Sequence, residues 1–290
     1  MQCIRIGCDT VEEQRPAVGR LTLVGTPIGN LSDFSPRALE ALRQCDFIAA
    51  EDTRVTLKLL NHFGVSRPLI SYFEHNKRER GEIICTRLLA GENGVLVTDA
   101  GMPAISDPGE DLVALCHERG IPVGVVPGPT AVATALAVAG LPTGRFCFEG
   151  FLSVNKRNRR EHLDSLRGET RTMVFYEAPH KLPVTLRDLA SAFGDRPVAL
   201  VRELTKIHEE VIRTTLSAAA ARFAEEAPRG EFVLVVAGAQ PPATPAMTVE
   251  QAAALAQDYM REGMSPSEAA KTAAAESGLK KGDIYRRLTE

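Results

Sequence analysis

The chain has 290 residues, of which 44% are hydrophobic and 24% are charged, so it is long enough for two α/β domains and a small appendage. The formal net charge of −3 excludes a surface that is basic throughout but allows a local basic face, and no apolar run reaches the roughly 18 residues of a membrane helix. The six cysteines form no CxxC pair and the six histidines no metal-ligand spacing, which predicts reduced thiols, a cytoplasmic location and no metal.

Residues 1–19 contain no secretion signal and are expected to form a loose tail. From residue 20 to residue 142, short apolar runs alternate with helical patterns. The apolar runs predict five strands, at Leu21–Gly25, Asp46–Ala50, Leu69–Phe73, Gly94–Thr98 and Ile121–Val126. Helices are predicted from Ser35-Pro36 onward and over Val55–Phe63, Glu82–Leu89, Glu110–Arg119 and Pro129–Ala139. This alternation predicts an N-terminal α/β domain whose mostly parallel sheet is covered by helices on both faces.

A second α/β domain is predicted over residues 143–239, because the strand and helix patterns resume after a boundary at 141–144. The predicted strands are Arg171–Tyr176, Pro197–Val201, Glu209–Arg213 and Glu231–Ala237, and the predicted helices are Pro179–Phe193 and Ser217–Ala227. Residues 240–245 form a proline-rich linker. Residues 246–290 contain only helical patterns, at Val249–Glu262, Ser265–Ser277 and Lys281–Leu288. The fold class is therefore α/β, with two α/β domains and a small, helix-turn-helix-like C-terminal appendage that is all helical.

Three segments rich in glycine and proline follow predicted strands of the first domain: Gly25–Asn30, Asp99–Gly109 and Pro127–Thr130. Ligands of open α/β sheets bind beyond the carboxyl ends of the strands, so these segments are expected to converge on one crevice. Tight turns without a ligand are the alternative for each segment taken alone. No GxGxxG follows the first strand and no GxxxxGK[ST] occurs in the chain, which disfavours a nicotinamide dehydrogenase and a P-loop enzyme.

Seven motifs occur along the chain in this order: VGTPIGN, EDTR, TDAGMPAISDPG, VPGPTA, FYEAPHK, RELTKIHEE and RGEFVLVV. Together they resemble the small-subunit ribosomal RNA methyltransferase I family of the tetrapyrrole-methylase superfamily. The resemblance covers about Leu21 to Ala237, and the final helical segment resembles that family's C-terminal extension. It implies two α/β domains of tetrapyrrole-methylase type, a homodimer, and S-adenosylmethionine as the cofactor between the domains. The implied reaction is 2′-O-methylation of a cytidine ribose in 16S rRNA, in the decoding region of the small ribosomal subunit.

The resemblance and the loop positions together suggest the cofactor-binding residues. Asp99 stands where relatives carry the aspartate of a similar loop, and Met102, Pro103 and Ile105 are expected to form an apolar wall for the adenosine. The amides that begin the helix after Pro129 can receive an anionic or hydroxyl oxygen. The alternative for each residue is an ordinary turn or core position. The expected set is Thr26, Pro27, Asp99, Gly101, Met102, Pro103, Ile105, Thr130, Ala131, Tyr176, Glu177, Leu204 and Gly230.

The implied chemistry is an in-line attack of a ribose hydroxyl on a sulfonium methyl group. Alignment of the reactants can supply about 7–11 kcal/mol, and a general base typically adds about 10²–10⁴-fold. The expected catalytic residues are Lys206, Glu203, Asp52 and Glu51, with His75 as a further candidate base. Lys206 can act as a base only if its surroundings lower its pKa, and a structural Lys–Glu ion pair is the alternative.

Local basic runs are expected to bind the phosphates of RNA. The sharpest is Asn155–Arg160, which is expected to overhang the crevice as a mobile arm, although a solvated surface loop is the alternative. The expected RNA-binding residues are Arg54, His75, Lys77, Arg78, Lys156, Arg157, Arg159, Arg160, Lys280 and Lys281.

Three competing hypotheses remain open from the sequence. The same fold can methylate a small macrocycle, as in precorrin methyltransferases, or a protein, as in diphthine synthase. The EDTR and RELTKIHEE motifs and the C-terminal appendage favour RNA over both substrates. From a different class, a catalytically inactive RNA-binding module is disfavoured by the intact glycine-rich loops.

Overall fold

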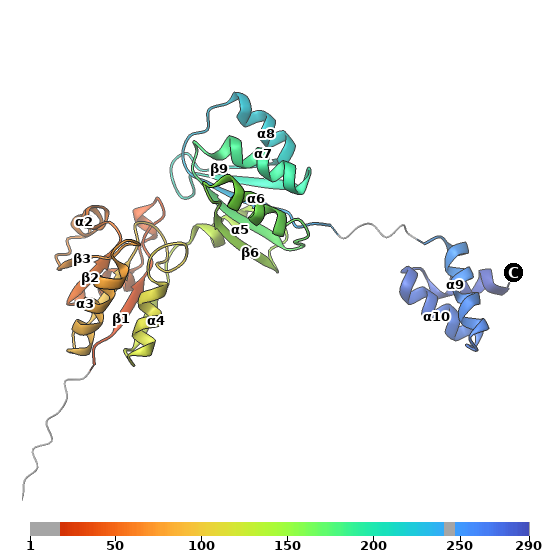
Figure 1. The fold of residues 1–290 in the computed structure, drawn as a ribbon, viewed down its shortest axis with the longest axis horizontal. Helices are drawn as coiled ribbons and strands as arrows, with labels where there is room; N and C mark the ends of the chain where they lie inside the picture. The colour runs from red at the N-terminus through yellow and green to blue at the C-terminus, as the bar shows by residue number, and fades with distance from the viewer. Residues whose placement is uncertain (1–17, 241–246, 290) are drawn as a thin grey trace, which may run out of the picture. The chain divides into compact units, whose positions relative to one another are not determined.

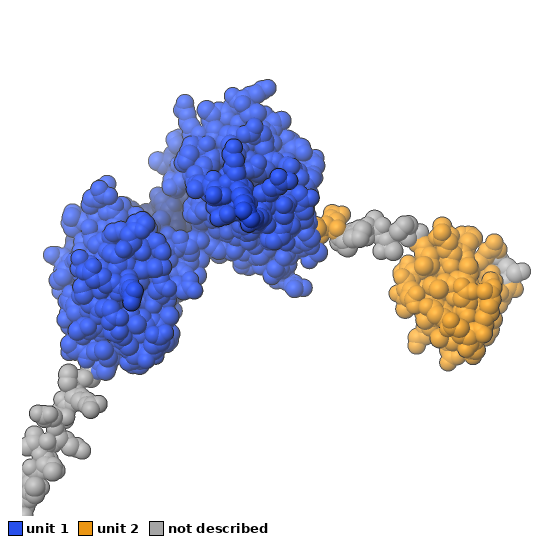
Figure 2. Space-filling view, viewed as in Figure 1, with its two compact units in different colours: residues 1–238 blue, residues 239–290 orange. Residues whose placement is uncertain are grey.

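The computed structural model describes residues 18–240 and 247–289, and the chain forms two compact units, residues 1–238 and 239–290 (Figure 2). The predicted tail up to residue 17 and residues 241–245 of the predicted linker lie outside the described residues. The cysteines at described positions are free thiols. Across the two described ranges, no helix has the length and apolar character needed to cross a bilayer.

The first sheet of unit 1 is entirely parallel, as the alternating pattern predicts. Its strands are β1 (Leu21–Val24), β2 (Phe47–Ala50), β3 (Leu69–Ser71), β4 (Gly94–Val97) and β5 (Val123–Val126). They lie in the order β3-β2-β4-β1-β5, which places β4 at the centre between β2 and β1. Central strands of such a sheet are buried on both faces, and both β2 and β4 are buried along their whole length.

Helices cover both faces of this sheet (Figure 1), because alternate strand residues point to opposite sides. Ile48 and Ala50 of β2 pack with helices α1 (Pro36–Gln44) and α2 (Thr53–His62). Phe47 and Ala49 pack on the other face with α3 (Lys77–Leu89) and α4 (Glu110–Glu118). A short 3-10 helix, η1 (Leu31–Asp33), precedes α1. The predicted two-sided cover of the sheet is thus confirmed.

The second sheet is mixed, and its first strand was not predicted. Its strands are β6 (Phe146–Phe151), β7 (Thr172–Glu177), β8 (Pro197–Arg202), β9 (Glu210–Thr215) and β10 (Phe232–Val236), in the order β6-β7-β10-β8-β9. Only β6 and β7 are parallel; the other three pairings are antiparallel. β6 lacks an apolar alternation because it contains Glu149 and Gly150, and its register shifts between Phe148 and Gly150.

The segment after β6 corrects one expectation. Asn155–Arg160 is not a mobile arm: Asn155 accepts hydrogen bonds from the amides of Arg157 and Asn158 and begins helix α6 (Lys156–Ser165). Leu163 is the only buried residue of α6, so the sequence shows almost no apolar periodicity there. The helix forms nonetheless because its N-cap satisfies two amides and Leu163 joins the core below it.

Helices α6, α7 (Leu182–Phe193) and α8 (Leu216–Glu225) share the core on one face of the second sheet. The other face is covered by α5 (Ala131–Ala139), whose Ala135, Leu136 and Ala139 pack on β7, β8 and β10. The sequence interpretation ends the first domain at residue 142 and so includes α5 in it, whereas the buried side of α5 belongs to the second sheet. The domain boundaries within unit 1 stay predictions.

Unit 2 is a three-helix assembly with a core of its own. Its helices are α9 (Val249–Arg261), α10 (Pro266–Ser277) and α11 (Lys281–Thr289). The core consists of small side chains from α9 and α10 together with Ile284, which lets the helices approach closely. Ser265 and Glu268 form a capping box at the start of α10, and Thr248 and Gln251 form another at the start of α9.

Candidate active site

A cavity of about 460 Å³ opens in unit 1 where loops from both sheets meet. The first sheet contributes residues that follow β1, β2, β4 and β5, which lie at the carboxyl edge that binds ligands in open α/β sheets. The second sheet contributes the ends of β6, β7 and β8 and the start of β10. Its lining residues are Ile28, Glu51, Asp99, Ala100, Gly101, Met102, Ile105, Ser106, Asp107, Thr130, Ala131, Phe151, Tyr176, Glu177, Ala178, Pro179, Val201, Leu204, Glu231, Phe232 and Val233.

Close backbone approaches bring the three glycine-rich loops together. Thr26 and Gly101 exchange two backbone hydrogen bonds, of 2.9 and 3.1 Å, and the Thr26 hydroxyl donates to the Thr98 carbonyl at 3.2 Å. A Cβ at Gly25 would lie 2.7 Å from the Cα of Gly128 and 2.7 Å from Met102 Sδ. Since such contacts leave no room for a side chain, glycine at position 25 lets the loops converge as predicted.

The loops around the cavity hold backbone conformations that side chains usually avoid. In the described part of the chain, every non-glycine residue with positive φ lies in one of two loops: Ala104 and Ser106 after β4, and Glu203 and Thr205 after β8. Their φ values range from 51° to 68°. Backbone of this kind persists only where surrounding contacts fix it, and it concentrates at ligand-binding sites. The two loops are therefore set by the fold rather than by local preference.

Three carboxylates make the first-sheet side of the cavity acidic. Glu51 accepts a hydrogen bond from the Thr98 hydroxyl at 2.6 Å, and Asp99 accepts one from the amide of Asp52 at 3.1 Å. Burial, and then the nearby Glu51, raise the pKa of Asp107 to about 6, and burial also raises the pKa of Asp99. Such a cluster favours a cationic ligand, because a positive charge would relieve the repulsion among the carboxylates. Among the described residues, no group of His, Cys, Asp and Glu side chains could hold a metal ion.

An aromatic and aliphatic wall faces these carboxylates. The ring of Tyr176 packs edge-on against Phe148 and Phe151, with centroid distances of 4.9 and 5.5 Å. Its hydroxyl accepts a hydrogen bond from the Val132 amide at 3.1 Å, which fixes the ring at the start of α5. Glu177 is buried and accepts from the Thr185 hydroxyl at 2.5 Å. The cavity can thus bury an apolar ring system while presenting acid groups to a cation.

Lys206 lies beside the cavity in a cluster with two glutamates. Its ammonium is 2.9 Å from Glu203 Oε1 and 3.0 Å from Glu231 Oε2, and Glu203 also accepts from the Glu231 amide. Burial alone would lower the pKa of Lys206, but hydrogen bonds to the two carboxylates outweigh it and raise the pKa. The condition for a lysine base is therefore not met. At Gly230 a Cβ would lie 2.6 Å from the Glu203 side chain, so glycine leaves room for this cluster.

Asp52, an expected catalytic residue, and Arg54, an expected RNA-binding residue, form a unit outside the cavity lining. Asp52 begins α2 and accepts hydrogen bonds from the Arg54 amide at 2.8 Å and from its guanidinium. These hydrogen bonds lower the pKa of Asp52 to about 2, which makes it a weak proton acceptor. Its backbone amide nevertheless positions the Asp99 carboxylate.

Most of the expected cofactor set reaches the cavity. Nine of these residues line it: Asp99, Gly101, Met102, Ile105, Thr130, Ala131, Tyr176, Glu177 and Leu204. Thr26, Pro27, Pro103 and Gly230 lie outside the lining, and of the expected catalytic residues only Glu51 belongs to it. Sequence reasoning did not single out Asp107, Phe151 and Glu231 as site residues. Asp107 lies within the TDAGMPAISDPG motif and Glu231 within RGEFVLVV, so the motifs could have identified both as site residues. Phe151 could not be identified, because β6 was not predicted.

The expected RNA-binding residues lie on several elements. Lys77 begins α3 and is paired with Glu74 and Asp111 at 2.8 and 2.6 Å, whereas Arg78 is exposed on the same helix. Lys156 to Arg160 occupy the first turns of α6. Lys280 and Lys281 belong to unit 2, where Lys281 donates to Ser267.

Comparisons with known proteins identify a matching family model and similar sequences. A family model described as Tetrapyrrole (Corrin/Porphyrin) Methylases matches residues 20–220. The Ribosomal RNA small subunit methyltransferase I of Synechocystis sp. is 48% identical over 270 residues, 93% of this chain and 97% of that protein. A protein of the same name from Thermotoga maritima is 48% identical over 221 residues, 76% of this chain and 99% of that protein.

Among solved structures, the uroporphyrin-III C-methyl transferase from Thermus thermophilus, complexed with S-adenyl homocysteine, has a similar fold, with a TM-score of 0.52 and 21% identity. That likeness covers 74% of this chain and 97% of the other.

Proposed function

The chain belongs to the tetrapyrrole methylase family and, within it, to the ribosomal RNA small subunit methyltransferase I proteins, and we propose that it transfers a methyl group from S-adenosylmethionine to the 2′-hydroxyl of a cytidine in 16S rRNA. Methylation of small-subunit rRNA follows from relatives that match almost their whole length. The cytidine and the 2′-oxygen are the finer part of the proposal. They rest on the motif resemblance.

The observation that carries the proposal is the combination of an acidic and an aromatic wall in one cavity. S-adenosylmethionine has a sulfonium and an ammonium group, which suit Glu51, Asp99 and Asp107, and an adenosine, which suits the apolar wall. When bound, it supplies a methyl group that is already activated as an electrophile. Its binding in this fold is supported by the similarly folded Thermus methyltransferase, whose structure is complexed with S-adenyl homocysteine.

The nine lining residues of the expected cofactor set are proposed to contact the cofactor directly. The other four are proposed to act through the loops. Thr26 and Pro27 hold the Gly101 turn through the paired backbone hydrogen bonds, and Pro103 continues that turn. Gly230 keeps the space that Glu203 needs beside Leu204.

The Lys206 cluster is proposed to meet the RNA at the edge of the cavity. With its pKa raised, Lys206 stays an ammonium that can orient a ribose or phosphate oxygen through hydrogen bonds. Glu231, which lines the cavity and is largely exposed, is a proposed acceptor of the hydroxyl proton, as is Glu51. Asp52 and Arg54 are proposed to act indirectly, by holding Asp99 and by offering a cation to RNA.

A transfer assay separates this function from its alternatives. The purified protein, small ribosomal subunits from a strain that lacks it, and S-adenosylmethionine with a labelled methyl group are expected to yield labelled 2′-O-methylcytidine. Uroporphyrinogen III in place of the subunits is expected to yield no labelled product. Label in the macrocycle and none in RNA would overturn the proposal. The homodimer implied by the resemblance is a separate proposal, which light scattering at micromolar concentration tests.

A further inference from the structure

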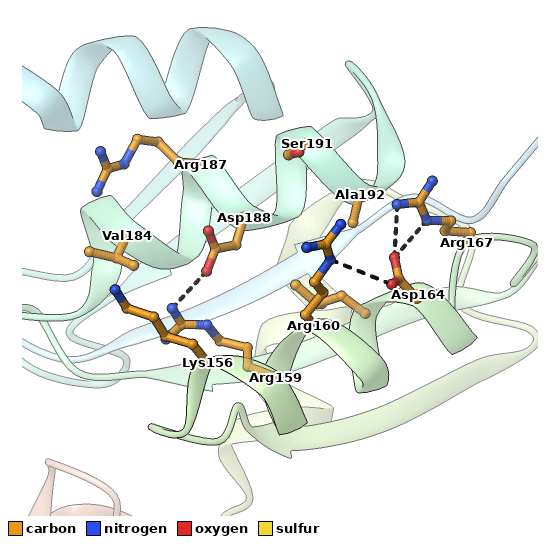
Figure 3. A pocket seen from close by; sticks show the side chains of 11 residues that line it. Lys156, Arg159, Arg160, Asp164, Arg167, Val184, Arg187, Asp188, Ser191 and Ala192 are labelled. Atoms are coloured by element: carbon orange, nitrogen blue, oxygen red, sulfur yellow. Dashed lines mark hydrogen bonds and ion pairs between the residues drawn. The ribbon is translucent and has the colours of Figure 1, made fainter.

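A second hollow, of about 660 Å³, lies between helices α6 and α7 and is separate from the cavity described above (Figure 3). Its α6 side is formed by residues spaced at three and four positions, which places them on one face of that helix. Five cationic and two acidic side chains line it, so the groove has a net positive charge in a chain whose total is negative. We call it the α6–α7 groove; it is lined by Lys156, Arg159, Arg160, Leu163, Asp164, Arg167, Val184, Arg187, Asp188, Ser191 and Ala192.

Ion pairs hold three of the five cationic side chains of this groove, and the other two remain available to bind a ligand. Arg159 reaches across to Asp188 at 2.8 Å, and Arg160 and Arg167 converge on Asp164 (Figure 3). Lys156 and Arg187 are exposed and make no hydrogen bond or ion pair within the described ranges. A single carboxylate cannot neutralise both Arg160 and Arg167. The groove therefore holds more positive charge than its own acids balance.

The position of the groove relates it to the cavity. β6 ends at Phe151 and β7 ends at Glu177, and both residues line the cavity. Helix α6 starts five residues after Phe151 and helix α7 five residues after Glu177, so the first turn of each helix lies close in the chain to a cavity-lining residue. Lys156 is at that end of α6, and Arg167 follows its other end, which is roughly 14 Å away at the rise of a helix. This length suits several consecutive phosphates of an extended strand.

We propose that the α6–α7 groove binds the phosphate backbone of the RNA strand that flanks the target nucleotide. This inference rests on the proposed function, since it takes the substrate to be RNA. A row of lysine and arginine side chains whose one end lies toward the cavity would hold the strand in register while one nucleotide enters, because phosphate contacts position a nucleic acid without reading its sequence. Arg157 and Glu161 pair with each other on another face of α6, so Arg157 lies outside this track.

The test uses the two cations that no described acid engages. Lys156→Ala combined with Arg187→Ala removes two charges without leaving a buried carboxylate unpaired. The matched control is Lys58→Ala combined with Arg43→Ala, which also removes one lysine and one arginine from exposed positions, on α2 and α1, outside the linings of the groove and the cavity. Thermal unfolding checks that both variants fold, and calorimetry with S-adenosylmethionine checks the cavity.

Filter binding to transcribed 16S rRNA is measured over a range of salt. The groove variant is expected to bind roughly tenfold more weakly, and its slope of log affinity against log salt is expected to fall by roughly 1.4, with cofactor affinity unchanged. The control should behave like the unaltered protein. Asp188→Asn should tighten RNA binding severalfold, because it removes a negative charge and releases Arg159. A purely structural groove would not give that gain.

The outcomes separate the two proposals. If the unaltered protein methylates RNA and the groove variant matches the control in affinity and salt slope, the groove proposal is overturned and the proposed function stands. If the unaltered protein binds no RNA, both are overturned. If the groove variant changes the molecular mass seen by light scattering and leaves RNA affinity intact, the groove is an interface between copies, which also overturns the proposal.

Discussion

The Asp107 carboxyl lies in the cavity with Glu51 and Asp99, and burial and Glu51 together raise its pKa to about 6. A folded-state pKa above the ordinary value means that the ionised form opposes folding. The neutral carboxylic acid contributes its full stabilisation when the pH is below 3.8, the pKa of the unfolded state. This stabilisation is lost as the pH rises through about 6, the pKa of Asp107 in the folded state. At neutral pH the cofactor-free protein therefore carries strain that a bound cation would relieve.

Replacement of this carboxyl separates stability from affinity. Asp107→Asn is expected to raise the free energy of unfolding at pH 8 by about 1 kcal/mol. A pKa shift of about two units corresponds to a larger free energy, but solvent screens the charge of this partly exposed carboxyl and reduces the effect. The gain should vanish as the pH falls toward 4, while affinity for S-adenosylmethionine at pH 8 should drop. Urea unfolding at both pH values and calorimetry measure the two effects. A variant less stable at pH 8 would refute the assignment.

Lys206 tests the chemistry at the same scale. Lys206→Ala is expected to lower turnover by roughly 100-fold with little change in cofactor affinity, because it removes a cation that would touch RNA and not the cofactor. Lys206→Arg keeps the charge and should retain part of the activity. Single-turnover methylation and calorimetry provide the readouts. Full turnover in Lys206→Ala would place the chemistry away from this cluster.

At the scale of elements, the sequence patterns worked best where one physical signal dominates. The parallel sheet follows from fully apolar strands, and the start of α10 follows from Ser265 and Glu268, a local capping box. The strand β6 was not predicted because Glu149 and Gly150 interrupt its apolar pattern. The helix α6 was not predicted because Leu163 is its only buried residue. The packing of α5 on the second sheet could not be read either, since periodicity shows a buried face but not its partner. Phe151 was missed as a site residue because β6 was not predicted, whereas the sequence motifs identified Asp99 and Tyr176 as site residues.

Loop convergence is a property of the elements and can be tested at one position. Gly25→Ala would place a Cβ 2.7 Å from Gly128 Cα, and backbone on both sides leaves little freedom to adjust. It is expected to cost about 1–3 kcal/mol of stability and to weaken cofactor binding, since Met102 lies equally close. Gly168→Ala is the control, because it has open space around it and its φ lies outside the left-handed region. Urea unfolding and calorimetry compare them, and equal cofactor affinities would argue against the loop account.

At the scale of the whole molecule, unit 1 contains the cavity and the α6–α7 groove, and unit 2 has its own alanine-rich core. The Thermotoga relative aligns over 99% of its own length with 76% of this chain, so about a quarter of this chain has no counterpart in that protein. We propose that unit 1 carries the chemistry and that unit 2, with Lys280 and Lys281, adds RNA affinity.

Removal of unit 2 tests that division. A chain ending at Gly238 is expected to keep its cofactor affinity and to bind 16S rRNA more weakly, with a smaller salt slope, because exposed cations are lost. Calorimetry and filter binding measure the two quantities. Loss of cofactor binding in a truncated chain that still unfolds cooperatively would show that the units do not divide in this way.

The central claim is that this chain methylates a cytidine ribose of 16S rRNA. Its most direct test is mass spectrometry of nuclease digests of 16S rRNA from a strain that lacks the protein, beside the same strain with the gene restored. We expect one 2′-O-methylcytidine to be missing without the protein, to return with the unaltered chain and not to return with Lys206→Ala. An unchanged set of ribose methylations in the strain without the protein would contradict it.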